Sequence, residues 1–165
     1  IGQGTEAHDG DEEDSISEAL GAENLPNGDS VFDFLPLEIN GRLVWIQHQG
    51  APAGRGITEG NALHNYMRNI YFTCLEDKRR LPDVIISGHY HRNVYDTFTR
   101  KEHTIHGIIV PPWQLKTRFG YRVAAAELDN IGLRVVGISS PVNGKGAIDV
   151  NEPILLQSRD EVVRI

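Results

Sequence analysis

Apolar and polar residues in the first half of the chain follow patterns that predict a hairpin, a helix and a buried strand. Leu35–Ile39 and Arg42–Gln47 are short strand-forming runs, and the Asn-Gly pair between them is typical of a two-residue hairpin turn. Over Asn61–Arg80 the apolar residues recur at helical spacing, which predicts a helix. Asp83–Ser87 is a short apolar run that predicts a buried strand.

Outside this region the sequence predicts one more helix and several strands. Ser15 and Glu18 fit a capping box, so a short helix is expected from Ile16 to Ala22. Further strands are expected at Val94–Thr99, Thr104–Val110, Tyr121–Leu128 and Leu133–Ser139. Asp129–Gly132 is interpreted as the turn of the last pair, and Ile154–Leu156 as one more strand or a docked arm.

This order of elements predicts an α/β or α+β fold, a β-sheet layered with helices. The length of 165 residues fits one compact domain. Residues 1–140 are interpreted as the body of that domain and residues 141–165 as its tail or edge strand. Apolar residues make up 39% of the chain and charged residues 24%, which suffices for a core and argues against a disordered chain.

Charge, cysteine content and hydropathy remove several classes of function. The net charge of −7 argues against tight nonspecific binding to nucleic acid, which stays open as a substrate. Cys74 is the single cysteine, so neither an internal disulfide nor a multi-cysteine zinc site is expected. No apolar run approaches the roughly 20 residues of a membrane helix, and the N-terminal residues do not resemble a signal segment. A cytoplasmic protein without a membrane partner is therefore expected.

The candidate chemistry centres on Gly88–His91, which reads Gly-His-Tyr-His and directly follows the buried strand. Histidines two residues apart can project the same way from extended backbone, and neutral imidazole is a common ligand of zinc, iron, manganese and nickel. The plain alternative is a polar strand end with two exposed histidines. Two weaker signals are His48, at the end of another apolar strand, and the acidic Gly-rich loop over residues 4–10. Each of these, taken singly, is more often structural.

Taken together, these segments resemble the C-terminal part of a calcineurin-like metallophosphoesterase domain. That family carries a Gly-Asn-His-Asp/Glu loop, a His at a strand end, a helix, and a strand that ends in Gly-His-Xaa-His. The last motif matches in full at Gly88, His89 and His91, and the strand-end His matches at His48. Residues 4–9 read Gly-Thr-Glu-Ala-His-Asp, which keeps the His-Asp pair but lacks the Asn. The resemblance spans about residues 4–92 and implies a layered β-sandwich flanked by helices.

The resemblance implies a hydrolase of phosphoesters that uses two divalent metal ions, manganese, zinc, iron or nickel, and a metal-bound hydroxide. It assigns His91 to the first metal, and His48 and His89 to the second. In place of the family's Asn, the oxygen ligand of the second metal would come from Glu6 or Thr5, or that metal would have fewer ligands.

Four further residues receive roles in the reaction or in substrate binding. By the resemblance, His8 is the candidate for protonating or stabilising the leaving oxygen, and Asp9 for orienting His8. Arg92 and Trp113 are candidates for contacting the substrate, with a surface Arg and a packed core Trp as the ordinary alternatives. The substrate is a phosphoester, and phosphodiesterase, phosphatase and nuclease activity, on a nucleotide or nucleic acid, all stay open.

The family's remaining ligands lie upstream, in an Asp-Xaa-His motif and a Gly-Asp motif, and residues 1–3 do not contain them. We therefore expect the whole enzyme to have an N-terminal part before Ile1 that activity requires. One alternative is a noncatalytic binding or scaffold module on the same fold, which the missing Asn favours. Another is an unrelated single-metal hydrolase that uses His89 and His91, for which no convincing third ligand lies nearby. The oligomeric state is not indicated by the sequence.

Overall fold

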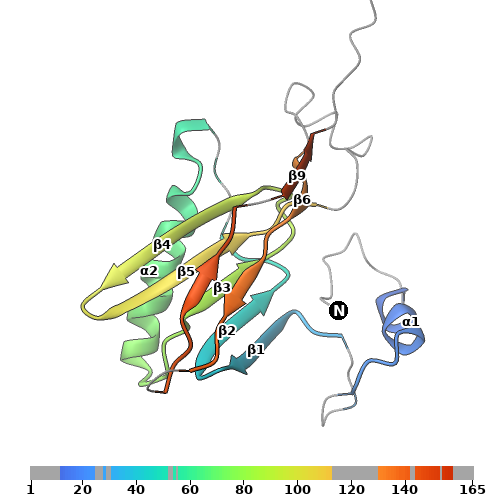
Figure 1. Cartoon of the computed structure of the whole chain (residues 1–165), viewed down its shortest axis with the longest axis horizontal. Coiled ribbons are helices and arrows are strands. Elements are labelled where there is room, and N and C mark those ends of the chain that lie inside the picture. The colour runs from blue at the N-terminus through green and yellow to red at the C-terminus, as the bar shows by residue number, and fades with distance from the viewer. Residues whose placement is uncertain are drawn as a thin grey trace, which may run out of the picture.

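The computed structural model describes residues 12–24, 28, 31–51, 54, 56–112, 130–141, 144–152 and 154–157 (Figure 1). The elements in chain order are α1 (Glu12–Ala19), β1 (Phe34–Ile39), β2 (Arg42–Gln47), a 3-10 turn (Gly56–Thr58), α2 (Asn61–Glu76), β3 (Val84–Ser87), β4 (Val94–Arg100), β5 (His103–Ile109), β6 (Asn130–Leu133), β7 (Val136–Ile138), β8 (Ile148–Val150) and β9 (Ile154–Gln157).

Five strands form one sheet in the order β1-β2-β3-β5-β4. Strands β2, β3 and β5 run parallel, whereas β1 pairs antiparallel with β2, and β4 pairs antiparallel with β5. Strand β3 lies between two parallel neighbours, and three of its four residues are buried, as its continuous apolar run predicts. Because β2 and β3 are parallel, the segments that follow them leave the sheet at the same edge.

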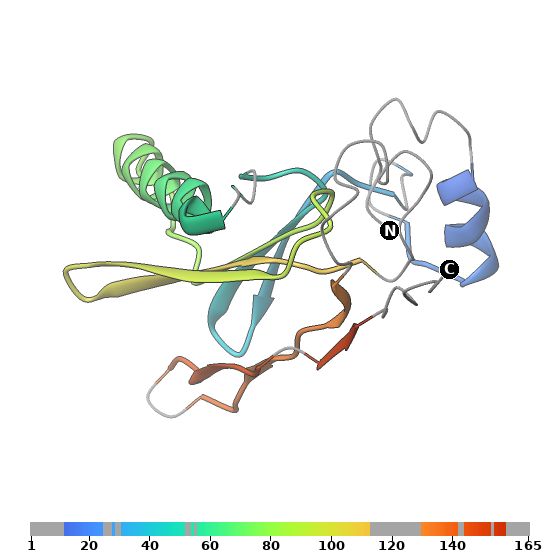
Figure 2. The ribbon, with the colours of Figure 1, turned by 90° about the horizontal axis from the view of Figure 1, so that it is seen from above.

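The sheet is covered on both faces (Figure 2). Helix α2 lies over one face, and the β7–β8 pair lies over the other. On the helix side, Leu63 and Met67 pack in one cluster with Ile85 and Ile105. On the opposite face, Val84 belongs to a second cluster with partly buried residues of β7 and β8. Successive side chains of a strand point to opposite faces, so the neighbours Val84 and Ile85 serve two different cores.

A glycine in β5 sets how closely α2 approaches the sheet. A Cβ atom at Gly107 would lie 2.6 Å from the sulfur of Met67 and 3.1 Å from Cδ1 of Leu63. Both side chains are fully buried beneath the helix. The missing side chain in the strand therefore makes the space that these two helix residues fill.

The main predictions for the fold are confirmed. Asn40 and Gly41 have φ values of 49° and 76°, the left-handed conformation that a two-residue hairpin turn requires. The flanking strands pair in register around them, with Ile39 opposite Arg42. Ile154–Leu156 belongs to a strand, β9, and not to an irregular arm. The α+β class, with a helix and a second β layer on the two faces of a sheet, is also confirmed.

Both helices end earlier than predicted. Helix α2 stops at Glu76 and not at Arg80, because Lys78 takes a left-handed conformation with φ 54°. The Lys78 and Arg79 amides then donate to the carbonyls of Leu75 and Cys74, which is a Schellman motif formed without glycine.

Helix α1 differs from its prediction at both ends. It spans Glu12–Ala19, so Ser15 lies inside the helix and does not cap it, and the predicted capping box is wrong. At the other end, Gly21 takes φ 65°, and its amide donates to the carbonyl of Glu18. The left-handed glycine closes the helix before Ala22.

The predicted strand over Leu133–Ser139 is two strands, β6 and β7. The chain changes partner at Arg134 and Val135, since β6 pairs with β9 and β7 pairs with β8. Residues 130–132 belong to β6, so the predicted turn at Asp129–Gly132 is wrong for its described part. The strand predicted at Tyr121–Leu128 lies outside the described residues.

Among the helices in the described part of the chain, none is long and apolar enough to cross a membrane. The cytoplasmic location and the division at residue 140 stay predictions.

A buried carboxylate joins the layers at the edge of the sheet where β3 begins. Asp83 is fully buried, accepts a hydrogen bond from the Leu43 amide at 2.9 Å and pairs with Arg42 at 2.8 Å and with Lys145 at 3.6 Å. The Arg42 guanidinium also donates to the carbonyl of Gly146 at 2.7 Å. Burial by itself raises the pKa of Asp83, but the Leu43 amide and the two cations outweigh it and hold the pKa below its ordinary value.

We predict that Asp83 makes the free energy of unfolding depend on acid pH. A carboxyl with a lowered folded-state pKa contributes stability above its unfolded pKa and loses it as the pH falls through the folded pKa. Asp83→Asn is expected to cost about 3 kcal/mol at neutral pH, because it leaves Arg42 without its buried partner. It should also flatten the fall of stability below about pH 4. Urea unfolding from pH 7 to pH 2.5 measures both effects.

Asp77→Asn is the matched control for this prediction. Asp77 pairs with Arg79 at 3.2 Å, but both side chains are about half exposed. Removing an exposed pair is expected to change stability by less than about 1 kcal/mol. Equal pH profiles for Asp83→Asn and the unmodified protein would contradict the role given to Asp83.

Candidate metal site at the ends of two parallel strands

The parallel pairing of β2 and β3 brings two histidines together at one edge of the sheet. Gln47 and Ser87 are partners in the last rung between these strands. His48 follows Gln47, and Gly88 and His89 follow Ser87, so a histidine lies one residue after β2 and another two residues after β3. The amide of Gly88 donates to the carbonyl of Gln47 at 3.1 Å and extends the pairing by one more bond.

The two imidazoles contact each other through nitrogen atoms. Nε2 of His48 lies 3.2 Å from Nδ1 of His89, and the ring centroids are 5.2 Å apart at an interplanar angle of 67°. His89 is exposed and His48 is half-buried. A hydrogen bond at this distance requires a hydrogen on one of the two nitrogens and a lone pair on the other.

The backbone of the Gly-His-Tyr-His loop is strained at both histidines. His89 and His91 have φ values of 70° and 51°, in the left-handed region that side chains other than glycine seldom adopt. The Tyr90 amide donates to the carbonyl of Gly88 at 2.9 Å, which closes a γ-turn around His89. A γ-turn with a central φ of about +75° is the rare, strained form. Tyr90 packs against the core on the helix side and anchors the loop.

A line of side-chain hydrogen bonds, one buried and one partly buried, lies at the last rung of the two strands before the histidine pair. The Tyr66 hydroxyl in α2 donates to Oε1 of Gln47 at 3.1 Å, and Nε2 of Gln47 donates to Oγ of Ser87 at 2.9 Å. A Cβ atom at Gly50 would overlap both the Ser87 hydroxyl and the Gln47 amide. The sequence pattern does not assign these polar residues to the site, and the one signal for them is a polar side chain at the end of each apolar run.

The structure places the predicted site residues in two groups. His48 and His89 meet, and His91 and Arg92 lie in the loop beside them, His91 exposed and Arg92 half-buried. The other predicted site residues lie outside the described part of the chain: Thr5, Glu6, His8, Asp9 and Trp113. Among the residues that the structure does describe, no group of three or more His, Cys, Asp and Glu side chains could hold a metal ion. A metal ion bound to His48 and His89 would therefore need further ligands from outside the described residues.

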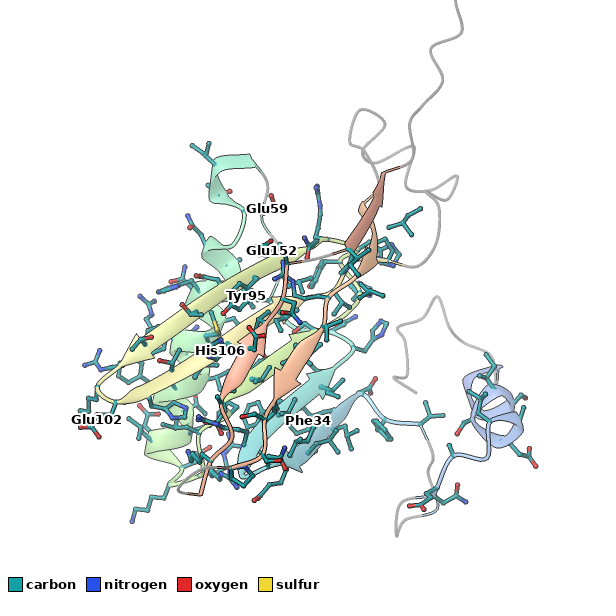
Figure 3. All side chains as sticks on the ribbon, viewed as in Figure 1. Phe34, Glu59, Tyr95, Glu102, His106 and Glu152 are labelled. Atoms are coloured by element: carbon teal, nitrogen blue, oxygen red, sulfur yellow. The ribbon has the colours of Figure 1, made fainter. Side chains whose placement is uncertain are left out.

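Three further histidines have partners elsewhere in the fold. His64 pairs with Asp96 at 2.9 Å, and His103 contacts the carbonyl of Pro82 at 2.9 Å. His106 and Tyr95 lie side by side on β5 and β4, with the Tyr95 hydroxyl 2.9 Å from Nδ1 of His106 (Figure 3). Burial lowers the pKa of His106, and the nearby Arg42 lowers it further. These three histidines therefore have partners other than the pair of His48 and His89.

Comparisons with known proteins add little to this geometry. No family model matches the chain, and no curated protein matches it. A solved structure of a Vps29 single mutant (D62A) from Entamoeba histolytica is similar over 81% of this chain, with 13% sequence identity and a TM-score of 0.38. The chain spans 64% of the length of that structure. A likeness of this size carries no weight for function.

We predict that His89→Gly raises the free energy of unfolding by about 1 kcal/mol. Glycine adopts positive φ without steric cost, so the substitution removes backbone strain while losing one exposed hydrogen bond. Lys101→Gly is the matched control, because Lys101 has φ 53° in the exposed turn between β4 and β5. Urea unfolding of both variants is the measurement. A loss of stability in His89→Gly beside a gain in Lys101→Gly would show that the His89 side chain holds the loop, against this prediction.

Proposed function

We propose that His48 and His89 bind one divalent transition-metal ion in a hydrolase of phosphoesters. The observation that carries the proposal is the 3.2 Å separation between Nε2 of His48 and Nδ1 of His89. Metal–nitrogen bonds of histidine are about 2.0–2.1 Å long, so two nitrogens on one ion lie about 3.0 Å apart at a right angle and about 3.4 Å apart at a tetrahedral angle. The separation in this protein falls between these two values.

The chemistry of the pair also fits a metal. Neutral imidazole is a ligand for zinc, iron, manganese and nickel, and a metal ion would take the place of the hydrogen between the two nitrogens. The second ring nitrogen of each histidine stays available to carry a hydrogen. Protons compete for the same nitrogens, so we expect metal binding to weaken as the pH falls.

Hydrolysis of a phosphoester is supported by the order of motifs around this pair. In this proposal His91 binds the first metal ion together with ligands from the family's Asp-Xaa-His and Gly-Asp motifs, and Glu6 or Thr5 completes the shell of the second ion, which His48 and His89 hold. Two metal ions supply a nucleophile from water at neutral pH and neutralise charge on the phosphoryl group. His8 gives a proton to the leaving oxygen, Asp9 holds His8 in the required orientation, and Arg92 and Trp113 contact the substrate.

A noncatalytic binding or scaffold module is the second candidate. Two observations favour it: residues 4–9 lack the Asn of the family motif, and the described residues contain no group of three ligands. The two candidates share the fold but differ in what the histidine pair does. In a scaffold, the contact between His48 and His89 would be a surface hydrogen bond with no metal function.

We predict that His48→Ala and His89→Ala each weaken zinc binding by more than about 100-fold, since each removes a ligand outright. His64→Ala is the control, because His64 is an exposed histidine with an aspartate partner outside the site. Elemental analysis of the purified chain and competition with a chromophoric chelator measure the binding. Zinc binding that is equal in all three variants would contradict the metal site.

Hydrolysis is tested on the full-length protein, with any upstream residues included. With added manganese, it should cleave a chromogenic phosphodiester, and His89→Ala should abolish cleavage. Metal binding without cleavage in the full-length protein would leave the site in place and favour the scaffold. Cleavage that survives His89→Ala would show that the reaction occurs elsewhere.

A further inference from the structure

The hydrogen bonds among Tyr66, Gln47 and Ser87 have a role beyond filling the core. We propose that they are a positioning device that sets the separation of the His48 and His89 nitrogens, and through it the affinity for metal. The inference rests on the proposed metal site and names the residues that hold that site in shape.

The location of the three residues supports this role. Gln47 directly precedes His48, and Ser87 lies two residues before His89, so the bond between their side chains joins the two strands at the last rung below the imidazoles. Tyr66 adds a third element, because it comes from α2 and donates to the same Gln47 side chain. The end of each strand is therefore fixed against its neighbour and against the helix.

The bond between Gln47 and Ser87 is buried and the bond from Tyr66 is partly buried, which argues that this line supplies orientation more than stability. Ser87 is fully buried and Gln47 is 9% exposed. A satisfied buried hydrogen bond adds little net stability, and replacing both partners by apolar groups of the same shape is often nearly neutral. A satisfied buried network does, however, restrict side chains to one arrangement. Gly50 leaves room for this arrangement, since any side chain there would overlap Gln47 and Ser87.

A metal ion accepts only a narrow range of nitrogen–nitrogen distances, so restricting the two histidines to one arrangement would favour binding. Nitrogen atoms on one ion lie between about 3.0 and 3.4 Å apart, and a shift of about 0.5 Å takes the pair outside that window. The backbone bond from Gly88 to Gln47 holds the main chains of the two strands together and does not itself orient a side chain. The hydrogen bonds among Tyr66, Gln47 and Ser87 restrict side-chain orientation, which that backbone bond does not.

The test is a zinc titration of the full-length protein and of three variants, with unfolding measured in parallel. Gln47→Met removes both side-chain bonds and keeps an unbranched side chain of similar length, and Tyr66→Phe removes one bond. Cys74→Ala is the control, because Cys74 is fully buried in the helix-side core and its loss lowers stability without touching the line. Cobalt absorption spectra of the same proteins report the geometry around the ion.

We expect zinc affinity to fall about 10- to 100-fold in Gln47→Met and by a smaller factor in Tyr66→Phe, and to stay unchanged in Cys74→Ala. The cobalt spectrum should change in the first two variants only. Unchanged affinity and spectrum in Tyr66→Phe and Gln47→Met, beside tight binding by the unmodified protein, would overturn the positioning role and leave the metal site intact. An unmodified protein that binds no zinc would overturn both.

Discussion

The parallel register between β2 and β3 is the constraint on which the candidate site depends. Parallel strands end at the same edge of a sheet, so pairing Gln47 with Ser87 places the next residues of both strands side by side. A shift of one residue in that register would send the Gln47 and Ser87 side chains to opposite faces and separate His48 from His89. The contact between the two imidazoles is thus a consequence of sheet pairing.

The two ends of β3 differ in burial and in backbone strain. At its beginning, Asp83 is buried and fully paired, and it ties the hairpin of β1 and β2 to the loop between β7 and β8. At its end, the backbone of His89 and His91 is strained and both side chains are exposed. Strain in exposed residues adds nothing to stability. Its position beside a nitrogen pair with metal-ligand spacing is therefore best explained by function.

The exposure of His48 and His89 argues against a purely structural role for their contact. A hydrogen bond between half-exposed and exposed side chains contributes little to folding, because water replaces it at small cost. The left-handed backbone at His89 costs more than that bond returns. A sequence under no functional demand would gain by placing glycine or asparagine at this position, and the presence of histidine favours a ligand role over a structural contact.

The sequence by itself determined those elements whose signals lie within a few neighbouring residues. The Asn-Gly turn, the helix starting at Asn61, the buried strand after Pro82 and the histidines at two strand ends are all readable from residue pattern and composition. The end of α2 differs from its prediction because a left-handed lysine, Lys78, closes the helix where glycine is the usual signal. The strand over Leu133–Ser139 was misjudged because β6 and β7 pair with different partners, which no local pattern records. Only the tertiary structure decided that Nε2 of His48 contacts Nδ1 of His89. It also decided that hydrogen bonds join Tyr66, Gln47 and Ser87 at the last rung before these histidines. These contacts join residues 19 to 41 positions apart, and sheet order and register, set by burial on both faces, bring them together.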